Sequence, residues 1–268
     1  MLYKARNGRI PFRDGDMHYV RFGRGKRILI MLPGLGDGLR SVEGAALPLA
    51  FMYREFGKSH TVYVFSRKSC IPQGYTTRDM ARDQRKAMEA LGIRQADVLG
   101  VSMGGMIAQH LAADAPDMVR RLLLVATSAQ PNPVLTESVT EWISFAERGD
   151  YLALLDSNVR RIYTEKYYRK NQWAIPVVEK ISRPKSYDHF LIQAQACLTH
   201  DAAARLPMIQ APTLVIGGEQ DRALGGEASR QIAAGIPRAR LWMYPEYGHG
   251  LYEEAKNFQD LVLAFLKG

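Results

Sequence analysis

The stretch Gly100-Val101-Ser102-Met103-Gly104-Gly105 has the residue types and the spacing of a serine nucleophile. A G-x-S-x-G turn between a strand and a helix holds its serine in a strained conformation and lifts the hydroxyl above the sheet edge. The flanking glycines are needed because Cβ atoms there would clash with neighbouring backbone. An apolar run precedes Ser102 and a helical pattern follows it, which is the context the motif requires. The segment therefore predicts acyl-transfer chemistry at Ser102.

A serine hydroxyl is a weak nucleophile and needs a general base, which in turn needs an orienting group. Asp221 follows the apolar run that ends at Gly217, and His249 lies in a glycine-flanked loop after the last apolar run. The carboxyl ends of parallel strands meet at one edge of a sheet, so the two side chains are expected beside Ser102. Taken singly, Asp221 could be a helix cap and His249 an ordinary loop residue. Together with Ser102, in this chain order, they predict a catalytic triad.

The oxyanion that forms during acyl transfer needs hydrogen-bond donors fixed in advance. The amide of Met103, at the start of the predicted helix, is one expected donor. The second is expected from the glycine-rich loop Pro33-Gly34-Leu35-Gly36-Asp37-Gly38, which follows an apolar run. We assign it to the amide of Leu35.

Short apolar runs alternate with longer segments of helical period, which indicates an α/β fold with a mainly parallel sheet. Helices are predicted for Asp79–Leu91, Met103–Ala113 and Glu254–Leu266. The alternating pattern of Met17–Phe22 predicts an outer antiparallel strand. The remaining strands are predicted at Ile28–Leu32, Thr61–Phe65, Asp97–Gly100, Leu122–Ala126, Thr213–Gly217 and Arg240–Tyr244.

The strand–helix alternation stops between Ala129 and Leu206, where helical patterns occur without clear strands. We interpret residues 131–205 as a helical lid inserted into a core made of residues 1–130 and 206–268. Most of the aromatic side chains of this segment are expected to form the lid's own core. They are Trp142, Phe145, Tyr151, Tyr163, Tyr167, Tyr168, Trp173 and Phe190.

The composition indicates a soluble globular protein without a nucleic-acid-binding module. The net charge is +9, but Lys and Arg are spread along the chain and no basic arm is interleaved with aromatic residues. Such a field could speed the encounter with an anionic substrate. No apolar run is long enough to span a membrane, and Met1–Arg6 is not followed by the apolar region of a signal peptide. The two cysteines form no CxxC pair, so we predict a cytoplasmic protein.

Other polar residues give weaker signals. Ser128 could line the pocket or lie in a turn. The basic residues of the lid, Arg160 and Arg161 among them, could form a solvated helix face or attract a carboxylate-bearing ester. No metal site is predicted, because the remaining histidines lack paired ligand spacing. They are His18, His60, His110, His189 and His200.

The chain resembles the α/β-hydrolase superfamily, in particular its lid-bearing esterase and lactonase branch. Gly100 to Gln109 (GVSMGGMIAQ) resembles the nucleophile turn of oxoadipate enol-lactonases and related carboxylesterases, as does the run from His200 to Asp221. The resemblance implies the α/β-hydrolase fold, a sheet of about eight strands, and a Ser-Asp-His acyl hydrolase without metal or organic cofactor.

Two departures from these relatives stand beside the expected site. Pro33 occupies the place of a histidine that usually begins the oxyanion loop. Ser66-Arg67-Lys68-Ser69 replaces an Asp-x-Arg-Gly turn after the strand that ends at Phe65. The resemblance therefore does not identify the substrate.

The predicted function is hydrolysis of a small carboxylic ester or lactone through an acyl-enzyme on Ser102. A serine at this position argues against haloalkane dehalogenases and epoxide hydrolases, whose nucleophile is an aspartate. Three alternatives use the same scaffold: a C–C bond hydrolase, a cofactor-free perhydrolase and a non-catalytic ligand receptor. Val101 leans against the C–C hydrolases, whose motif often reads Gly-Asn-Ser. A homodimer is left open.

Overall fold

The computed structural model describes residues 4–268, so residues 1–3, the start of the predicted core, lie outside it. Its centre is one eight-stranded sheet of order β1-β2-β4-β3-β5-β6-β7-β8, parallel from β4 to β8 and antiparallel at β1 and β2. The predicted α/β class and mainly parallel sheet are confirmed. The strands are β1 (Arg6–Phe12), β2 (Gly15–Gly23), β3 (Arg27–Leu32), β4 (His60–Lys68), β5 (Ala96–Val101), β6 (Val119–Val125), β7 (Thr213–Gly218) and β8 (Ala239–Tyr244).

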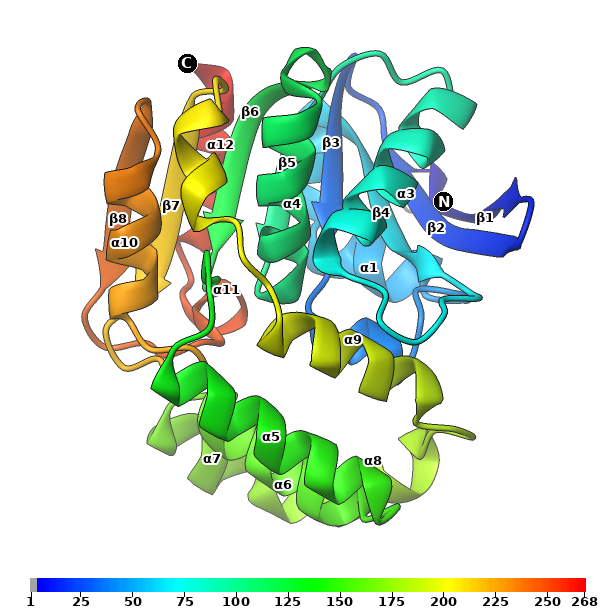
Figure 1. Ribbon diagram of the computed structural model, residues 1–268, viewed down its shortest axis with the longest axis vertical. Helices are drawn as coiled ribbons and strands as arrows, with labels where there is room; N and C mark the ends of the chain where they lie inside the picture. Colours follow the sequence, from blue (N-terminus) through cyan, green and yellow to red (C-terminus); the bar gives the residue numbers. More distant parts are fainter. Residues whose placement is uncertain (1–3) are drawn as a thin grey trace.

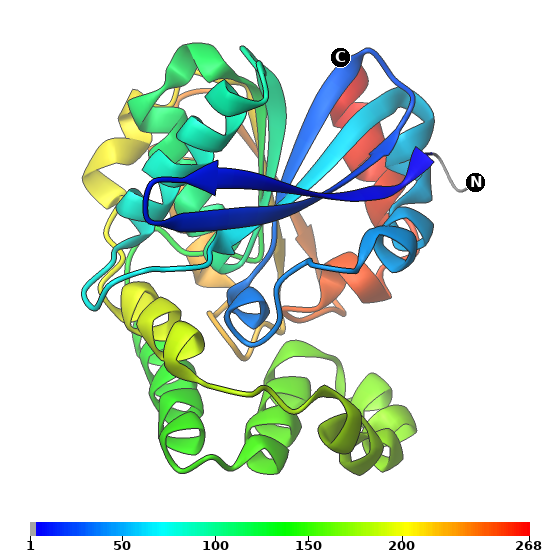
Figure 2. The same ribbon diagram turned by 90° about the vertical axis from the view of Figure 1, so that its right-hand side faces the viewer.

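Two layers of helices bury the two faces of the sheet, as Figure 2 shows with the sheet edge-on. The central strands β5 and β7 are buried at every residue, which explains why they are mainly apolar. The charged exception is Asp97 of β5, which is buried and pairs with Arg120. One layer consists of α3 (Thr77–Ala90), α4 (Met103–Asp114) and α10 (Glu227–Gly235). The other consists of α1 (Ala46–Met52), α2 (Arg54–Ser59) and α12 (Phe258–Lys267).

The sheet edge differs from the sequence prediction. Met17–Phe22 is antiparallel as predicted, but it is not outermost, because β1 pairs with it on the outside. The segment RNGRIPF of β1 carries Asn, Gly and Pro, which are poor strand formers, and it is tolerated at an edge where one side needs no partner.

The predicted terminal helix Glu254–Leu266 was wrong at its start. The structure has a short α11 (Leu251–Glu254), an extended Ala255 and then α12. The carboxylate of Glu254 accepts hydrogen bonds from the amide and the hydroxyl of Thr164. This contact with a residue 90 positions away is invisible to a local helical pattern.

The helices between β6 and β7 from Pro133 to Leu198 lie together at one end of the molecule (Figure 1). The division at residues 131 and 205 stays a prediction, and the 3-10 helix Ala203–Met208 crosses its second boundary. No helix in residues 4–268 is long and apolar enough to cross a membrane. The helices of this segment are α5 (Pro133–Glu147), α6 (Tyr151–Ile162), α7 (Glu165–Asn171), α8 (Ile175–Ser182) and α9 (Asp188–Leu198).

Candidate active site

Ser102 lies in a strained turn between β5 and α4, with φ 53° and ψ −123°. Its amide donates to the carbonyl of Val125 at 2.9 Å, and its carbonyl accepts from the hydroxyl of Thr127 at 2.7 Å. These bonds hold the turn from the neighbouring strand β6. A non-glycine residue at positive φ is strained and persists only where its surroundings fix it.

Two glycines let the turn pack tightly. A Cβ on Gly104 would overlap the carbonyl oxygen of Leu32, and a Cβ on Gly100 would overlap the carbonyl oxygen of Gly104. Both obstacles are backbone atoms, which cannot swing away as a side chain does. The helix α4 can therefore begin directly beside β3 and β5 only because these positions carry no side chain.

Asp221 and His249, from the loops after β7 and β8, form a buried hydrogen-bonded pair. His249 Nδ1 lies 2.8 Å from Oδ2 of Asp221, while Oδ1 accepts from the amides of Ala223 and Leu224 at 2.8 Å each. Burial alone would raise the pKa of Asp221, but His249 and the two amides outweigh it and the pKa is lowered. The ionised carboxylate only accepts hydrogen bonds, so Nδ1 donates and Nε2 is left free to act as a base.

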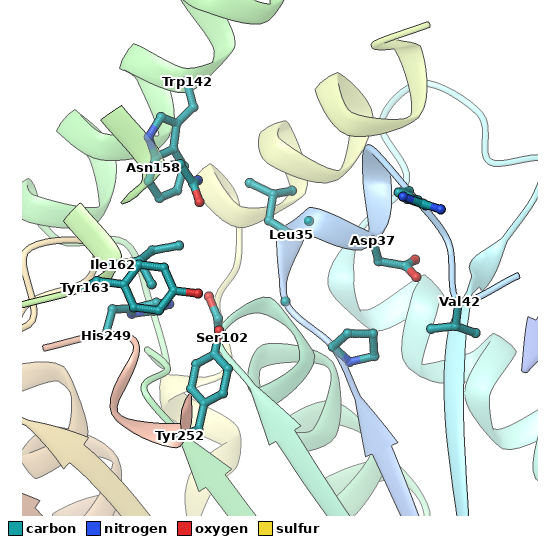
Figure 3. A pocket seen from close by; sticks show the side chains of 14 residues that line it. Leu35, Asp37, Val42, Ser102, Trp142, Asn158, Ile162, Tyr163, His249 and Tyr252 are labelled. Atoms are coloured by element: carbon teal, nitrogen blue, oxygen red, sulfur yellow. The ribbon is translucent and has the colours of Figure 1, made fainter. Parts of the chain in front are cut away.

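Ser102 and His249 line the same pocket, a cavity of about 360 Å³ between the sheet edge and the helices of the lid segment (Figure 3). The core contributes the loop after β3 and Tyr252 of α11. The lid segment contributes Trp142, Asn158, Ile162 and Tyr163. Sequence patterns do not identify these four residues, since their convergence depends on how α5 and α6 pack.

The amides of Leu35 and Met103 make no hydrogen bond with an acceptor in residues 4–268. Leu35 lies in the 3-10 turn Leu35–Gly38 directly after β3 and lines the pocket. The turn is close to the serine, because a Cβ on Gly34 would lie 3.3 Å from that of Ser102. Both amides are therefore available to a ligand, and their role as oxyanion donors stays a prediction.

A buried arginine braces the loop in which Pro33 replaces the usual histidine. Arg67, at the end of β4, donates from Nη2 to the carbonyl of Pro33 at 2.6 Å, and its amide donates to Oδ2 of Asp37 at 2.8 Å. Burial lowers the pKa of its guanidinium, while Asp37 and Cys197 act in the opposite direction. The two departures, Pro33 and the turn that contains Arg67, therefore contact each other, which their separation in the sequence does not reveal.

The lid segment is tied to the histidine loop. The amide of Gly250, next to His249, donates to the carbonyl of Ile162 at 2.6 Å. The hydroxyl of Tyr163 donates to Glu253 at 2.6 Å. Ile162 and Tyr163, two of the residues that line the pocket, are thus fixed to the loop that carries the candidate base.

The side chains of Arg160 and Arg161 are not in the pocket. Arg160 pairs with Asp156 at 2.7 Å, and Arg161 bonds Glu137 and Glu141 of α5. Their charges are paired with carboxylates of the lid segment, which argues against the alternative that they attract an anionic ester. The cation that does line the pocket is Arg40 of the loop after β3, which is exposed.

Ser128 lies in the irregular segment after β6 and is absent from the pocket lining. Its hydroxyl donates to the carbonyl of Gln130 at 2.6 Å. Among residues 4–268 no group of three His, Cys, Asp or Glu side chains could hold a metal ion. Two of the remaining histidines, His110 and His200, pack edge to face in the core.

Residues 27–256 match the family model described as the alpha/beta hydrolase fold. The chain belongs to the α/β-hydrolase family. A 2-hydroxy-6-oxononadienedioate/2-hydroxy-6-oxononatrienedioate hydrolase of Pseudomonas sp is 25% identical, over 94% of this chain and 92% of its own length. MGS-M2, an α/β-hydrolase enzyme from a deep-sea metagenome library of the Medee basin, is 26% identical with a TM-score of 0.85, over 97% and 98% of the two chains.

The enol-lactonase from Burkholderia xenovorans LB400 has the same fold as this α/β hydrolase. The two share 23% identity and a TM-score of 0.80, over 97% of this chain and 100% of the other. The resemblance to lid-bearing hydrolases is thus confirmed at the level of the superfamily, and the enzyme class is that of the hydrolases.

Proposed function

We propose that this α/β hydrolase cleaves a small carboxylic ester or lactone through an acyl-enzyme on Ser102. The observation that carries the proposal is the 2.8 Å bond between His249 and Asp221, in a pocket that the strained Ser102 also lines. A buried base held in one tautomer by a carboxylate, beside a serine hydroxyl, is the arrangement that activates serine for attack on a carbonyl.

The proposed reaction has two halves. Ser102 Oγ attacks the carbonyl carbon while Nε2 of His249 takes the hydroxyl proton, and Asp221 stabilises the imidazolium. The oxygen of the tetrahedral intermediate is received by the amides of Leu35 and Met103. The imidazolium then protonates the leaving oxygen, and a water molecule activated by His249 hydrolyses the acyl-enzyme.

A C–C bond hydrolase is the second candidate. It is favoured by the 25% identity with the Pseudomonas hydrolase of 2-hydroxy-6-oxononadienedioate. That substrate is a diacid, and Arg40 in the pocket offers a counter-charge for a carboxylate. We place the hydrolysis of an ester or lactone before C–C bond hydrolysis because Val101 occupies the position where an asparagine is common in C–C hydrolases.

The test is a panel of p-nitrophenyl esters, lactones and vinylogous diketones. We expect the wild type to hydrolyse an ester or lactone and Ser102→Ala to lose about four or more orders of magnitude in kcat. Ser128→Ala is the matched control, because its hydroxyl lies in the segment after β6, outside the pocket. Turnover confined to the diketones would favour the second candidate. Undiminished turnover by Ser102→Ala would refute the mechanism.

We also propose a reducing, cytoplasmic location, since Cys70 and Cys197 are both free thiols. Treatment of the protein purified from its native host with a thiol-alkylating reagent should label Cys70, which is exposed, without prior reduction. Labelling only after reduction would contradict this location.

A further inference from the structure

An apolar stripe without a partner runs along α8. Trp173, Val177 and Ile181 follow one another at intervals of four residues and are 74%, 54% and 78% exposed. They belong to α8 and the helical turn before it, within the lid segment and away from the sheet (Figures 1 and 2). A tryptophan exposed to this degree, beside two exposed aliphatic side chains, indicates a surface that a binding partner covers when the protein functions.

The segment that carries the stripe is positively charged. Residues 163–187 contain six Lys or Arg and two Glu, a local net charge of +4. Both glutamates are neutralised within the segment, because Glu165 pairs with Arg169 and Glu179 pairs with Arg183. The four remaining cations are exposed and have no ion pair within residues 4–268. They are Lys166, Lys170, Lys180 and Lys185.

The combination selects one kind of partner. Lysine is depleted from the cores of protein–protein interfaces, whereas an apolar stripe with tryptophan, flanked by lysines, is typical of helices that lie in a membrane interface. Lysine stems cover apolar surface while their ammonium groups reach the headgroups. We propose that the lid segment binds an anionic phospholipid surface, with Trp173, Val177 and Ile181 inserted at headgroup level.

A second side of α8, with the buried Ile175 and the partly exposed Val178, links this surface to the pocket. Ile175 and Val178 line a second, mainly apolar cavity of about 240 Å³, and Tyr163 lines both this cavity and the pocket of Ser102. A chain entering from a bound lipid surface would meet apolar side chains as far as Tyr163. This consequence rests on the proposed function, whereas the binding itself does not.

Sedimentation with sucrose-loaded vesicles tests the binding. We expect the full chain to partition onto vesicles of equal phosphatidylglycerol and phosphatidylcholine at least tenfold more strongly than onto phosphatidylcholine alone. Replacing Lys166, Lys170 and Lys180 by Gln should weaken the partition by about fivefold per lysine. Trp173→Ser combined with Ile181→Ser should weaken it at least tenfold.

Two controls separate this surface from others. Trp242→Ser should leave the partition unchanged, because Trp242 is 43% exposed on β8, outside the lid segment. Ser102→Ala should also bind as the wild type does, so that a failure of the proposed catalysis is distinguished from a failure of docking. Brominated lipids should quench tryptophan emission in Trp242→Phe and not in Trp173→Phe.

Equal binding to neutral and anionic vesicles would overturn the proposal. So would undiminished binding by the Trp173→Ser, Ile181→Ser variant. Analytical ultracentrifugation provides a further check. A dimer that the same two substitutions dissociate would assign the stripe to a second copy of the chain and overturn the lipid partner.

Discussion

Replacing the strained serine by glycine should stabilise the protein while abolishing its activity. Ser102 has φ 53° and ψ −123°, a region that glycine reaches freely and L side chains rarely adopt. Such a conformation costs on the order of 1–3 kcal/mol. Ser102→Ala is the reference, because it removes the hydroxyl and keeps the Cβ atom that causes the strain.

The expected difference follows from two opposing terms. Relief of strain favours the glycine variant by about 1–3 kcal/mol, and the greater freedom of glycine in the unfolded chain opposes it by about 0.5–1 kcal/mol. The midpoints of the two ranges give a net gain of about 1 kcal/mol. An unfolding entropy of about 2.1 cal/mol/K per residue gives the 268-residue chain about 0.6 kcal/mol/K. Ser102→Gly should therefore melt about 2 °C above Ser102→Ala.

Differential scanning calorimetry of both variants, at one pH and scan rate, measures the difference. Both should be inactive on the ester panel, so the comparison isolates the backbone. If Ser102→Gly melts at or below Ser102→Ala, the turn is not strained by its Cβ atom and the reasoning fails.

Three further predictions concern packing, substrate charge and acid stability. Gly104→Ala should lower the free energy of unfolding in urea by about 3 kcal/mol or more, because its methyl group would overlap backbone atoms. The control Gly36→Ala, with open space around it, should change the free energy of unfolding by less than about 1 kcal/mol. Arg40→Gln should lower kcat/KM about twofold to fivefold for an anionic ester and leave kcat/KM for a neutral ester unchanged. Arg161→Gln is the control, because Arg161 lies outside the pocket. Equal losses of kcat/KM for both esters would contradict a role for the charge of Arg40. Burial lowers the pKa of His110 to about 4, below its ordinary value of 6.5. Its stabilising contribution is therefore complete above pH 6.5 and is lost as the pH falls toward 4. The free energy of unfolding should drop by about 2 kcal/mol more between pH 7 and pH 4.5 in the wild type than in His110→Asn; parallel pH profiles would count against this.

Features encoded in short stretches were predictable from the sequence. The buried strands were found because a parallel strand covered on both faces is mainly apolar, as β5 and β7 are apart from Asp97 and Thr213. Ser102, Asp221 and His249 were found because each lies within five residues of the end of a strand, and the structure brings the last two into contact. Their catalytic roles stay predictions.

Features that depend on long-range packing were not predictable. Arg67 contacts Pro33 from a different strand, 34 residues away, so no local pattern reveals that one substitution is accompanied by the other. The sequence does not distinguish Trp142 from Trp173, because both lie in helical patterns of the lid segment. In the structure Trp142 lines the pocket, whereas Trp173 is 74% exposed. Only the packing of the helices of the lid segment distinguishes them.

The order of the strands has a consequence for synthesis of the chain. The strand β6 pairs with β7 on one side, but 87 residues, 126–212, separate the end of one from the start of the other. At about 5–20 residues per second, a ribosome needs roughly 4–17 s to make them. During that interval the nascent chain carries an apolar strand with an open edge, a template for wrong pairing. During that interval Ser102 has already been synthesised and Asp221 and His249 have not. The candidate nucleophile therefore has no base until the last strands have been made.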